Sequence, residues 1–310
     1  MLTSFKISKL FGLHDYDLVF SESEDDKIRF ITATNGYGKS SILRLIDAAF
    51  NHHLETFFKI PFHELSLTVD NAVLNLRQVK GVVAPGNKEL EVVDKDEDVA
   101  IEFSIGMGTP ASSTTLTMDD VKSGSKGMDD VLQQIEMFFS SETCKFIDDR
   151  RLFRENTDDS ELVRLSDLLR ERILRHDDNT EKQIEVLKKI VEGSCFADKH
   201  MEISEDFGFR FVMDNEDGTK LAMSDLSSGE QHIMLISLYM LFDAPEKAIV
   251  LIDEPEMSFH LTWQGDYLKN LRQIVALRNV QCIVATHSPI IFDSEYSIAI
   301  DLYDQMHPEE

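Results

Sequence analysis

The chain has 310 residues, of which 57 are acidic and 31 basic, and its formal net charge is -26. This length suits one large domain or two smaller ones, and the acidic excess argues against a long basic track for a nucleic-acid backbone. The three cysteines, Cys144, Cys195 and Cys282, lie far apart and predict neither a zinc site nor a disulfide framework. No segment approaches about 18 uninterrupted apolar residues, so we expect a cytoplasmic protein with no signal peptide and no membrane span.

The first fifty residues predict strands, then a glycine loop, then a helix. The segment "DKIRFITAT" alternates apolar and polar residues and ends in β-branched ones, which is typical of a strand entering the core. Apolar residues from Ile42 to Phe50 then recur at helical spacing. A strand, loop and helix start in this order place backbone amides and the positive end of the helix dipole around a phosphate group.

The loop itself, "ATNGYGKSS", matches the phosphate-binding pattern G-x-x-x-x-G-K-[ST] except at its first position, where Ala33 replaces Gly. Gly36 and Gly38 stand where backbone N–H groups must approach phosphate oxygens without an intervening Cβ. Lys39 and Ser40 close the pattern. The alternative is a glycine turn before an ordinary helix.

The middle of the chain predicts strands and helices without recognisable chemistry. The segment "ELSLTVDNAVLNLRQVKGVV" alternates as antiparallel strands do, and "DVAIEFSIGM" predicts a further strand. Residues 106–127 are rich in Gly, Ser, Thr and Asp and predict an irregular insertion. Residues 159–191 carry leucine and isoleucine at helical spacing, which predicts one or two amphipathic helices.

Two apolar segments near the end of the chain predict buried strands that finish in polar residues. In "AIVLIDEP" the strand ends at Asp253 and Glu254. We expect Asp253 to hold Mg²⁺ and Glu254 to polarise the water that attacks a γ-phosphate. In "CIVATHSP" the strand ends just before His287, which could sense the γ-phosphate and that water. A plain turn after the first strand and a structural loop histidine after the second are the alternatives.

The segment "DLSSGEQ" lies between these regions. The Ser228 hydroxyl, the Gly229 amide and a helix N-terminus near Glu230 would together form a second phosphate-binding surface. The alternative is an ordinary helix cap made by a Ser and a Glu.

In chain order, "NGYGKS", "LSSGEQ", "LIDEPE" and "ATHSP" resemble the Walker A loop, signature, Walker B strand and switch histidine of ATP-binding-cassette ATPases. The variants "NGYGKSS" and "DEPEMSFH" are similar to the soluble branch that includes chromosome-maintenance and recombination-repair ATPases. Within it, the chain resembles the ATPases of OLD-type nucleases and of Septu-like and retron-associated antiphage systems. The resemblance covers residues 28–41 and 223–292 and is weak between them.

This resemblance implies an α/β fold: an ATP-binding-cassette ATPase head with a mixed sheet, an antiparallel β part and a helical insertion lobe. It implies a single domain over residues 1–310, with the helical insertion at about 128–195 between the Walker A and signature halves. It also implies a head-to-tail homodimer or higher oligomer around two Mg-ATP, in which the signature of one protomer meets the ATP of the other. The implied nucleotide-binding residues are Asn35, Gly36, Gly38, Lys39, Ser40, Ser41, Ser227, Ser228, Gly229 and Glu230, with Ser40 and Asp253 on Mg²⁺ and Glu254 and His287 in catalysis.

The chain departs from the family pattern at three points. Ala33 could strain the loop if that position needs a positive φ. His260 stands where transporter-type cassettes have an Asp after the Walker B strand. The glutamine of the lid is not identifiable, because Gln78, Gln133 and Gln134 all compete for that position.

The hypothesis with most support is a regulatory ATPase that controls an effector protein in trans, a nuclease or toxin, in bacterial antiphage defence. Long heptad arms are absent between Lys39 and Ser228, and we expect any nuclease to be a separate chain because 23 residues follow His287.

The alternative is a DNA-binding repair ATPase that senses nucleic acid directly, through arginines of residues 148–178. Asp and Glu are interleaved with these arginines, which favours ion pairs over DNA contacts. The soluble-branch motifs disfavour the ATPase subunit of a membrane transporter.

Overall fold

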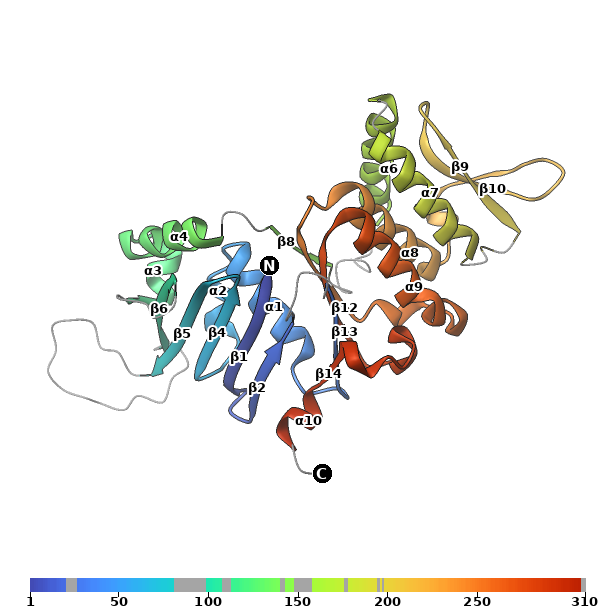
Figure 1. Cartoon of the computed structure of the whole chain (residues 1–310). Helices are drawn as coiled ribbons and strands as arrows, with labels where there is room; N and C mark the ends of the chain where they lie inside the picture. The colour runs from blue at the N-terminus through green and yellow to red at the C-terminus, as the bar shows by residue number, and fades with distance from the viewer. Residues whose placement is uncertain are drawn as a thin grey trace, which may run out of the picture. The chain divides into compact units, whose positions relative to one another are not determined.

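The computed structural model describes residues 1–20, 27–80, 99–107, 113–139, 143–147, 158–175, 178–193, 196 and 198–307. It divides into two compact units (Figure 1). The first unit comprises Met1–Phe146 with Ile300–Glu310, and the second comprises Ile147–Ala299.

The first unit is built on a six-stranded antiparallel sheet in the order β2-β1-β4-β5-β6-β7. Its strands are β1 (Leu2–Leu10), β2 (His14–Val19), β4 (Glu64–Val69), β5 (Ala72–Lys80), β6 (Val99–Met107) and β7 (Thr114–Thr117). The register pairs Phe5 with Leu67 and Leu67 with Leu74, and all three side chains are buried. Because side chains alternate along a strand, the other face carries Lys6 and Arg77 in ion pairs with neighbouring strands.

The remaining elements of the first unit include the strand and helix expected around the glycine loop. They are β3 (Ile28–Thr32), α1 (Lys39–Phe50), α2 (Glu55–Lys59), α3 (Met118–Ser123), α4 (Lys126–Phe139) and α10 (Leu302–Met306). The short strand β14 (Ala299–Asp301) lies beside β3, and β8 (Cys144–Ile147) ends at the boundary of the unit.

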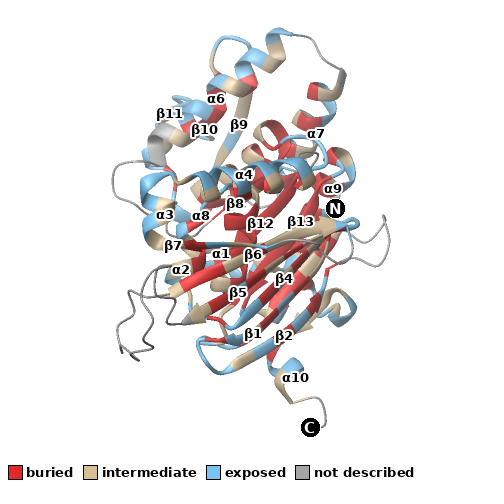
Figure 2. Cartoon of the chain, turned by 90° about the vertical axis from the view of Figure 1, so that its left-hand side faces the viewer, coloured by how far each residue is buried: buried red, intermediate tan, exposed pale blue. Residues whose placement is uncertain are grey.

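The second unit contains a parallel strand pair and a small antiparallel sheet. The strands β12 (Ile249–Asp253) and β13 (Gln281–Thr286) run parallel, and every residue in both is buried (Figure 2). The small sheet has the order β11-β10-β9, from β9 (Lys199–Ser204), β10 (Gly208–Met213) and β11 (Lys220–Leu221). Its longer helices are α6 (Asp158–Leu174), α7 (Asp178–Gly193), α8 (Ser228–Leu238) and α9 (Leu261–Arg278).

The expected α/β fold is confirmed, because helices accompany both antiparallel and parallel strand pairs. The two amphipathic helices expected at residues 159–191 are α6 and α7. The insertion lobe at about 128–195 stays a prediction. Among the described residues, no helix combines the length and the apolar character that crossing a membrane requires. Cys144 and Cys282 are buried free thiols, and Cys195 lies outside the described residues.

The expectation of an irregular segment at residues 106–127 was wrong for its described part. Strand β7 and helix α3 occupy residues 114–123, and Leu116 is buried. A capping box starts α3: the Thr117 hydroxyl accepts from the Asp120 N–H, and the Asp120 carboxylate accepts from the Thr117 N–H. Ser, Thr and Asp are frequent in loops for the same hydrogen-bonding reason, so composition alone did not distinguish a cap from a loop.

Helix α6 packs against the start of β10 through Ser166 and Gly208. The Ser166 hydroxyl donates to the Phe207 carbonyl at 3.1 Å and accepts from the Phe209 N–H at 3.2 Å. Gly208 has φ +73°, and a Cβ added there would lie 2.3 Å from the Ser166 carbonyl oxygen. This close approach of backbone to backbone requires glycine.

We therefore expect Gly208→Ala to lower the free energy of unfolding by about 2–4 kcal/mol, through the positive φ and the overlap with Ser166. Chemical denaturation measures the change. Gly265→Ala is the matched control, because Gly265 lies in α9 with no heavy atom within 4 Å of an added Cβ. It should stabilise the protein by about 0.5–1 kcal/mol, since alanine is the better helix former. Equal effects from the two substitutions would contradict the proposed packing.

Candidate functional site

The glycine loop of the first unit connects β3 to α1, as expected from the sequence. Gly36 and Gly38 have φ values of 97° and 87°, and Gly38 is the N-cap of α1. A Cβ at Gly38 would also lie 2.7 Å from Leu10 Cδ2. Ala33 is buried and is not among the described residues with positive φ, so its methyl group causes no backbone strain. Alanine in place of the first glycine of the pattern is therefore compatible with the conformation of the loop.

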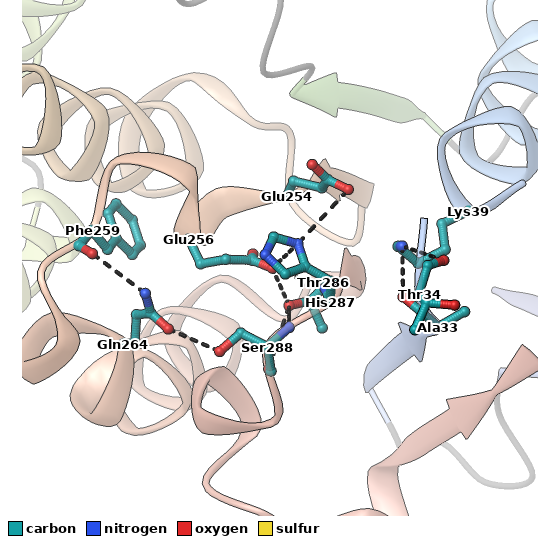
Figure 3. A network of polar contacts seen from close by, with 10 residues as sticks. All are labelled: Ala33, Thr34, Lys39, Glu254, Glu256, Phe259, Gln264, Thr286, His287 and Ser288. Atoms are coloured by element: carbon teal, nitrogen blue, oxygen red, sulfur yellow. Dashed lines mark hydrogen bonds and ion pairs between the residues drawn. The ribbon is translucent and has the colours of Figure 1, made fainter. Parts of the chain in front are cut away.

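The Lys39 side chain folds back over the loop that precedes it (Figure 3). Its Nζ donates to the Ala33 carbonyl at 2.8 Å and to the Thr34 carbonyl at 3.4 Å, and the residue is only 4% exposed. Ser40 and Ser41 follow in the first turn of α1, while Asn35 is exposed in the turn before it. The helix N-terminus, the two glycines and the ammonium together provide the donors that a polyphosphate requires.

Sequence reasoning missed the support given to this loop by Tyr16 and His14 of β2. The Tyr16 hydroxyl donates to the Tyr37 carbonyl at 2.9 Å, and the Tyr37 ring stacks on the His14 ring at 5.6 Å. Burial, with a smaller effect from Tyr37, raises the pKa of Tyr16 to about 12. Tyr16 therefore stays a neutral hydrogen-bond donor at physiological pH. Tyr16 and Tyr37 are 21 positions apart, and no local sequence pattern predicts their contact.

In the second unit, the parallel pairing of β12 with β13 brings two of the expected residues together. The register matches Asp253 with Ala285, and the Glu254 N–H donates to the Ala285 carbonyl at 2.9 Å. Asp253 is buried, whereas Glu254 is partly exposed. Glu254 has φ 46° and ψ 54°, a left-handed conformation that costs a glutamate of order 1–3 kcal/mol. Such strain is typical of functional positions.

His287 follows β13 and lies between two carboxylates (Figure 3). Its Nδ1 is 3.9 Å from Glu254 Oε1 and 3.2 Å from Glu256 Oε1. The sequence predicted the proximity of Glu254 and His287 but not the contact with Glu256. The only sequence signal for Glu256 was a third acid in "DEPE", two residues after Glu254.

The signature segment begins helix α8 with the Ser and Glu helix cap that was the alternative interpretation of it. Ser227 is the N-cap of α8, and its N–H donates to Glu230 Oε2 at 2.8 Å. Glu230 is buried and also pairs with Lys199 at 2.9 Å, so its carboxylate shapes the helix N-terminus from inside the unit. Ser227 and Ser228 are exposed in front of it. A role for Ser227, Ser228, Gly229 and Glu230 in nucleotide binding stays a prediction.

The residues expected to hold Mg²⁺ have suitable chemistry. Ser40 provides a hydroxyl at the start of α1, and Asp253 provides a carboxylate at the end of β12. No cluster of three or more His, Cys, Asp or Glu side chains suited to a metal occurs among the described residues. Mg²⁺ does not need one, because it is usually bound by one or two protein ligands, substrate phosphates and waters. Ser40 of the first unit and Asp253 of the second each offer an oxygen ligand of the kind that Mg²⁺ takes.

Gln78, one candidate for the lid glutamine, has a different role. Its Nε2 donates to the carbonyls of Phe57 and Ile60, and its Oε1 accepts from the Phe62 N–H at 3.1 Å. These bonds hold the segment after α2 against β5. We therefore do not assign Gln78 to a lid, and Gln133 and Gln134 of α4 stay unassigned.

His260, the second departure from the family pattern, is the N-cap of α9. Its Nδ1 lies 3.0 Å from the Thr262 hydroxyl and accepts from the Thr262 N–H. The described contacts of His260 are thus those of a helix cap.

A protein-family model matches most of the chain. Residues 34–293 match the model of the family described as "AAA domain, putative AbiEii toxin, Type IV TA system". The chain belongs to this family. The matched range includes the Lys39 loop, the α8 N-terminus and the ends of β12 and β13.

Single relatives resemble this AAA-family chain less extensively. It is 34% identical to Protein ea59 of Escherichia phage lambda over 92 residues, which are 29% of this chain and only 17% of that protein. The SMC head domain from Thermotoga maritima overlaps 96% of this chain and 92% of its own, with 14% identity and a TM-score of 0.43.

An SmcHead bound to the C-winged helix domain of ScpA overlaps 97% of this chain and 93% of its own, at 11% identity and a TM-score of 0.45. At these identities and TM-scores the likeness decides neither the fold nor the activity of this chain.

Helix α8 also carries a buried histidine that makes the second unit sensitive to acid. Burial lowers the pKa of His232 from 6.5 to about 4, and the ring lies 5.2 Å from the Phe259 ring. Because the folded-state pKa lies below the unfolded-state one, this histidine contributes stability above pH 6.5 and loses it as the pH falls towards 4.

The test compares the unfolding free energies of the parent and of His232→Phe. We expect the parent's value minus the variant's value to fall by about 3 kcal/mol as the pH is lowered from 7 to 4. Denaturant titrations of both proteins at each pH measure this difference, and groups common to both proteins cancel. A pH-independent difference for His232→Phe would contradict a buried neutral imidazole.

Proposed function

We propose that this AAA-family chain binds Mg-ATP and hydrolyses it to ADP and phosphate. The observation that carries the proposal is the strained Glu254 at the end of β12, with His287 3.9 Å away at the end of the parallel strand β13. A carboxylate and an imidazole at the carboxyl ends of adjacent parallel strands lie where open α/β sheets bind ligands. The Lys39 loop of the first unit is the proposed phosphate-binding group.

In the proposed complex, the amides of Gly36 and Gly38, with Ser41 and the exposed Asn35 beside them, surround the phosphates. The Lys39 ammonium exchanges the Ala33 and Thr34 carbonyls for β- and γ-phosphate oxygens. Ser40 and Asp253 would hold Mg²⁺, which neutralises phosphate charge when bound.

In the proposed reaction, Glu254 orients a water and takes its proton as the water oxygen bonds to the γ-phosphorus. The bond from that phosphorus to the β,γ-bridging oxygen breaks, and ADP leaves with the electron pair. His287 would contact the γ-phosphate or form a hydrogen bond with the attacking water. Most of the catalytic effect then comes from positioning and charge stabilisation, as is general for phosphoryl transfer.

We further propose that two chains form a head-to-tail dimer, or a unit of a higher oligomer, around two nucleotides. Ser227 and Ser228 are exposed at the N-terminus of α8, and the buried capping box keeps this helix start in place. An exposed helix N-terminus is suited to binding the γ-phosphate of a nucleotide held by another protomer. Closure of such a dimer would depend on ATP.

The closed dimer would control an effector in trans, a nuclease or toxin, in bacterial antiphage defence. The family description, with its putative AbiEii toxin, supports a role beside a second component. The sequence motifs, which resemble those of OLD-type and Septu-like systems, support the defence context. A cytoplasmic location follows from this proposal.

Direct DNA sensing is the weaker hypothesis. Arg164 pairs with Glu161 and Asp243, Arg170 donates to the Glu205 carbonyl, and Arg175 pairs with Glu171. The pairs with Glu161 and Glu171 are intrahelical, as the interleaved charges predicted. Arg150, Arg151 and Arg154 lie outside the described residues. Nucleic acid remains a partner to test by adding DNA to the assays below.

ATP binding should depend on Lys39 and ATP hydrolysis on Glu254. We expect Lys39→Ala to abolish the rise in melting temperature that ATP causes in the parent, because the ammonium no longer binds the phosphates. Glu254→Gln should keep that rise but lower turnover by at least about a hundredfold, because the amide cannot take the proton of water. Thermal shift and phosphate-release assays measure the two effects.

The controls are a lysine and a glutamate with ordinary surface roles. Lys59→Ala removes an exposed ammonium paired with Glu55, and Glu246→Gln removes an exposed carboxylate before β12. Both should behave as the parent. Unchanged stabilisation of Lys39→Ala by ATP, or parental turnover by Glu254→Gln, would overturn the corresponding assignment.

Mixing two inactive variants tests the composite dimer. Lys39→Ala and Ser228→Arg should each be inactive alone, but their heterodimer has one intact loop facing one intact signature. With half the dimers mixed and the sites independent, turnover should recover to about a quarter of the parental value. Phosphate release is measured as the two variants are titrated together, after native mass spectrometry has confirmed heterodimers.

The control is Ser123→Arg, which adds the same charge at an exposed position at the end of α3 and should keep parental turnover. Parental hydrolysis by Ser228→Arg alone would rule out the composite site. Confirmed heterodimers without recovery would rule out independent sites.

A further inference from the structure

Glu256 is a buried acid that the proposed reaction does not use. It lies in the short 3-10 turn Pro255–Ser258 after Glu254 and is only 3% exposed. A buried carboxylate is costly unless its hydrogen bonds are satisfied. Its contacts therefore indicate what it contributes.

All described hydrogen bonds of the Glu256 side chain go to two consecutive residues, Thr286 and His287, at the end of β13 (Figure 3). Its Oε1 accepts from the Thr286 hydroxyl at 2.5 Å and from the His287 N–H at 2.9 Å, and it lies 3.2 Å from His287 Nδ1. One oxygen thus contacts both the backbone and the ring of His287. This geometry fixes the ring relative to its own main chain.

A second set of bonds holds the same segment from its other side. The Ser288 N–H donates to the Thr286 hydroxyl at 3.0 Å, and the Ser288 hydroxyl donates to Gln264 Oε1 at 2.8 Å. Gln264 Nε2 in turn donates to the Phe259 carbonyl at 3.3 Å. These bonds hold the backbone of residues 286–288 without contacting the imidazole. Among the described residues, only Glu254 and Glu256 place a carboxylate oxygen within ion-pair distance of the ring.

The second oxygen of Glu256 has no hydrogen-bond partner among the described residues, which a purely structural role does not explain. Glu256 Oε2 and the Tyr267 hydroxyl are both buried without a hydrogen-bond partner among the described residues. Burial is the main cause that raises the pKa of Tyr267, with smaller effects from Cys282 and Glu256. The carboxylate thus leaves one oxygen unsatisfied in the core. Bonds to Thr286 and to the His287 N–H alone would need only a neutral acceptor.

We propose that Glu256 is a positioning residue that holds His287 in the tautomer with the proton on Nδ1. An ionised carboxylate only accepts hydrogen bonds, so the nitrogen facing it must carry the proton. In the neutral ring, Nε2 is then the acceptor, on the opposite side of the imidazole from Glu256. A carboxylate that orients an imidazole in this way fixes the tautomer and the direction of the ring. The consequence for turnover rests on the proposed ATPase function.

The tautomer can be measured without nucleotide by NMR of the ring nitrogens of the full chain at about pH 8, where an ordinary imidazole is neutral. The signals of His287 are those missing from His287→Asn. We expect a protonated Nδ1 and an unprotonated Nε2 in the parent. Glu256→Met, which removes the acceptor at similar volume, should shift His287 to the Nε2–H form.

Two further variants separate positioning from stability. Glu256→Gln keeps an acceptor oxygen and should retain the Nδ1–H form. Thr286→Val removes one bond of Oε1 without touching the ring, so it should lower the melting temperature and keep the tautomer. If Glu256→Met does not fold, the spectra of the parent and of these two variants still show whether His287 carries its proton on Nδ1.

In turnover assays, Glu256→Met should lower kcat by about ten- to a hundredfold and change the Kd for ATP by less than about twofold. Glu256→Gln should recover most of that loss. An Nε2–H tautomer in the parent, or an unchanged tautomer in folded Glu256→Met, would overturn the proposal. A parent that shows the Nδ1–H form but no ATP hydrolysis would instead overturn the proposed function.

Discussion

The parallel pairing of β12 with β13 is the constraint on which the chemistry of the second unit depends. Side chains alternate between the two faces of a strand, so a slip of one residue would move Asp253 and its neighbours to the opposite faces. The burial of every residue in both strands disfavours such a slip. The ladder extends one residue further, to the bond from the Glu254 N–H to the Ala285 carbonyl. Glu254 and His287 therefore leave the sheet at neighbouring points.

The turn after β12 converts this register into a polar site. Glu254 takes a left-handed conformation, and Pro255 starts a 3-10 turn that directs Glu256 to the end of β13. Two acids two positions apart thus reach the same imidazole from a single turn. The first unit uses a comparable arrangement, in which Gly36 and Gly38 carry the unusual backbone angles and Tyr16 holds the loop from β2.

Much of this arrangement could be predicted from the sequence. Continuous apolar segments followed by polar residues predicted β12 and β13, and the spacing of Gly36, Gly38 and Lys39 predicted the loop before α1. Glu256 could not be assigned, because the direction of its side chain depends on the turn that Pro255 starts. Tyr16 was missed because its contact with Tyr37 depends on tertiary structure. For Glu230 the sequence allowed two interpretations, because a glutamate at this position is typical both of a helix cap and of the family's signature motif. The structure shows the helix cap.

The left-handed backbone of Glu254 limits which residues can occupy this position. Glycine adopts such angles without strain and asparagine does so more readily than glutamate, whereas β-branched residues are the most strongly disfavoured. Selection for thermal stability alone would therefore favour glycine or asparagine at position 254. Retaining glutamate keeps a carboxylate beside His287 at the expense of local backbone stability. In a thermostabilised version of this protein, a change at position 254 would remove the carboxylate to which we assign the proposed hydrolysis.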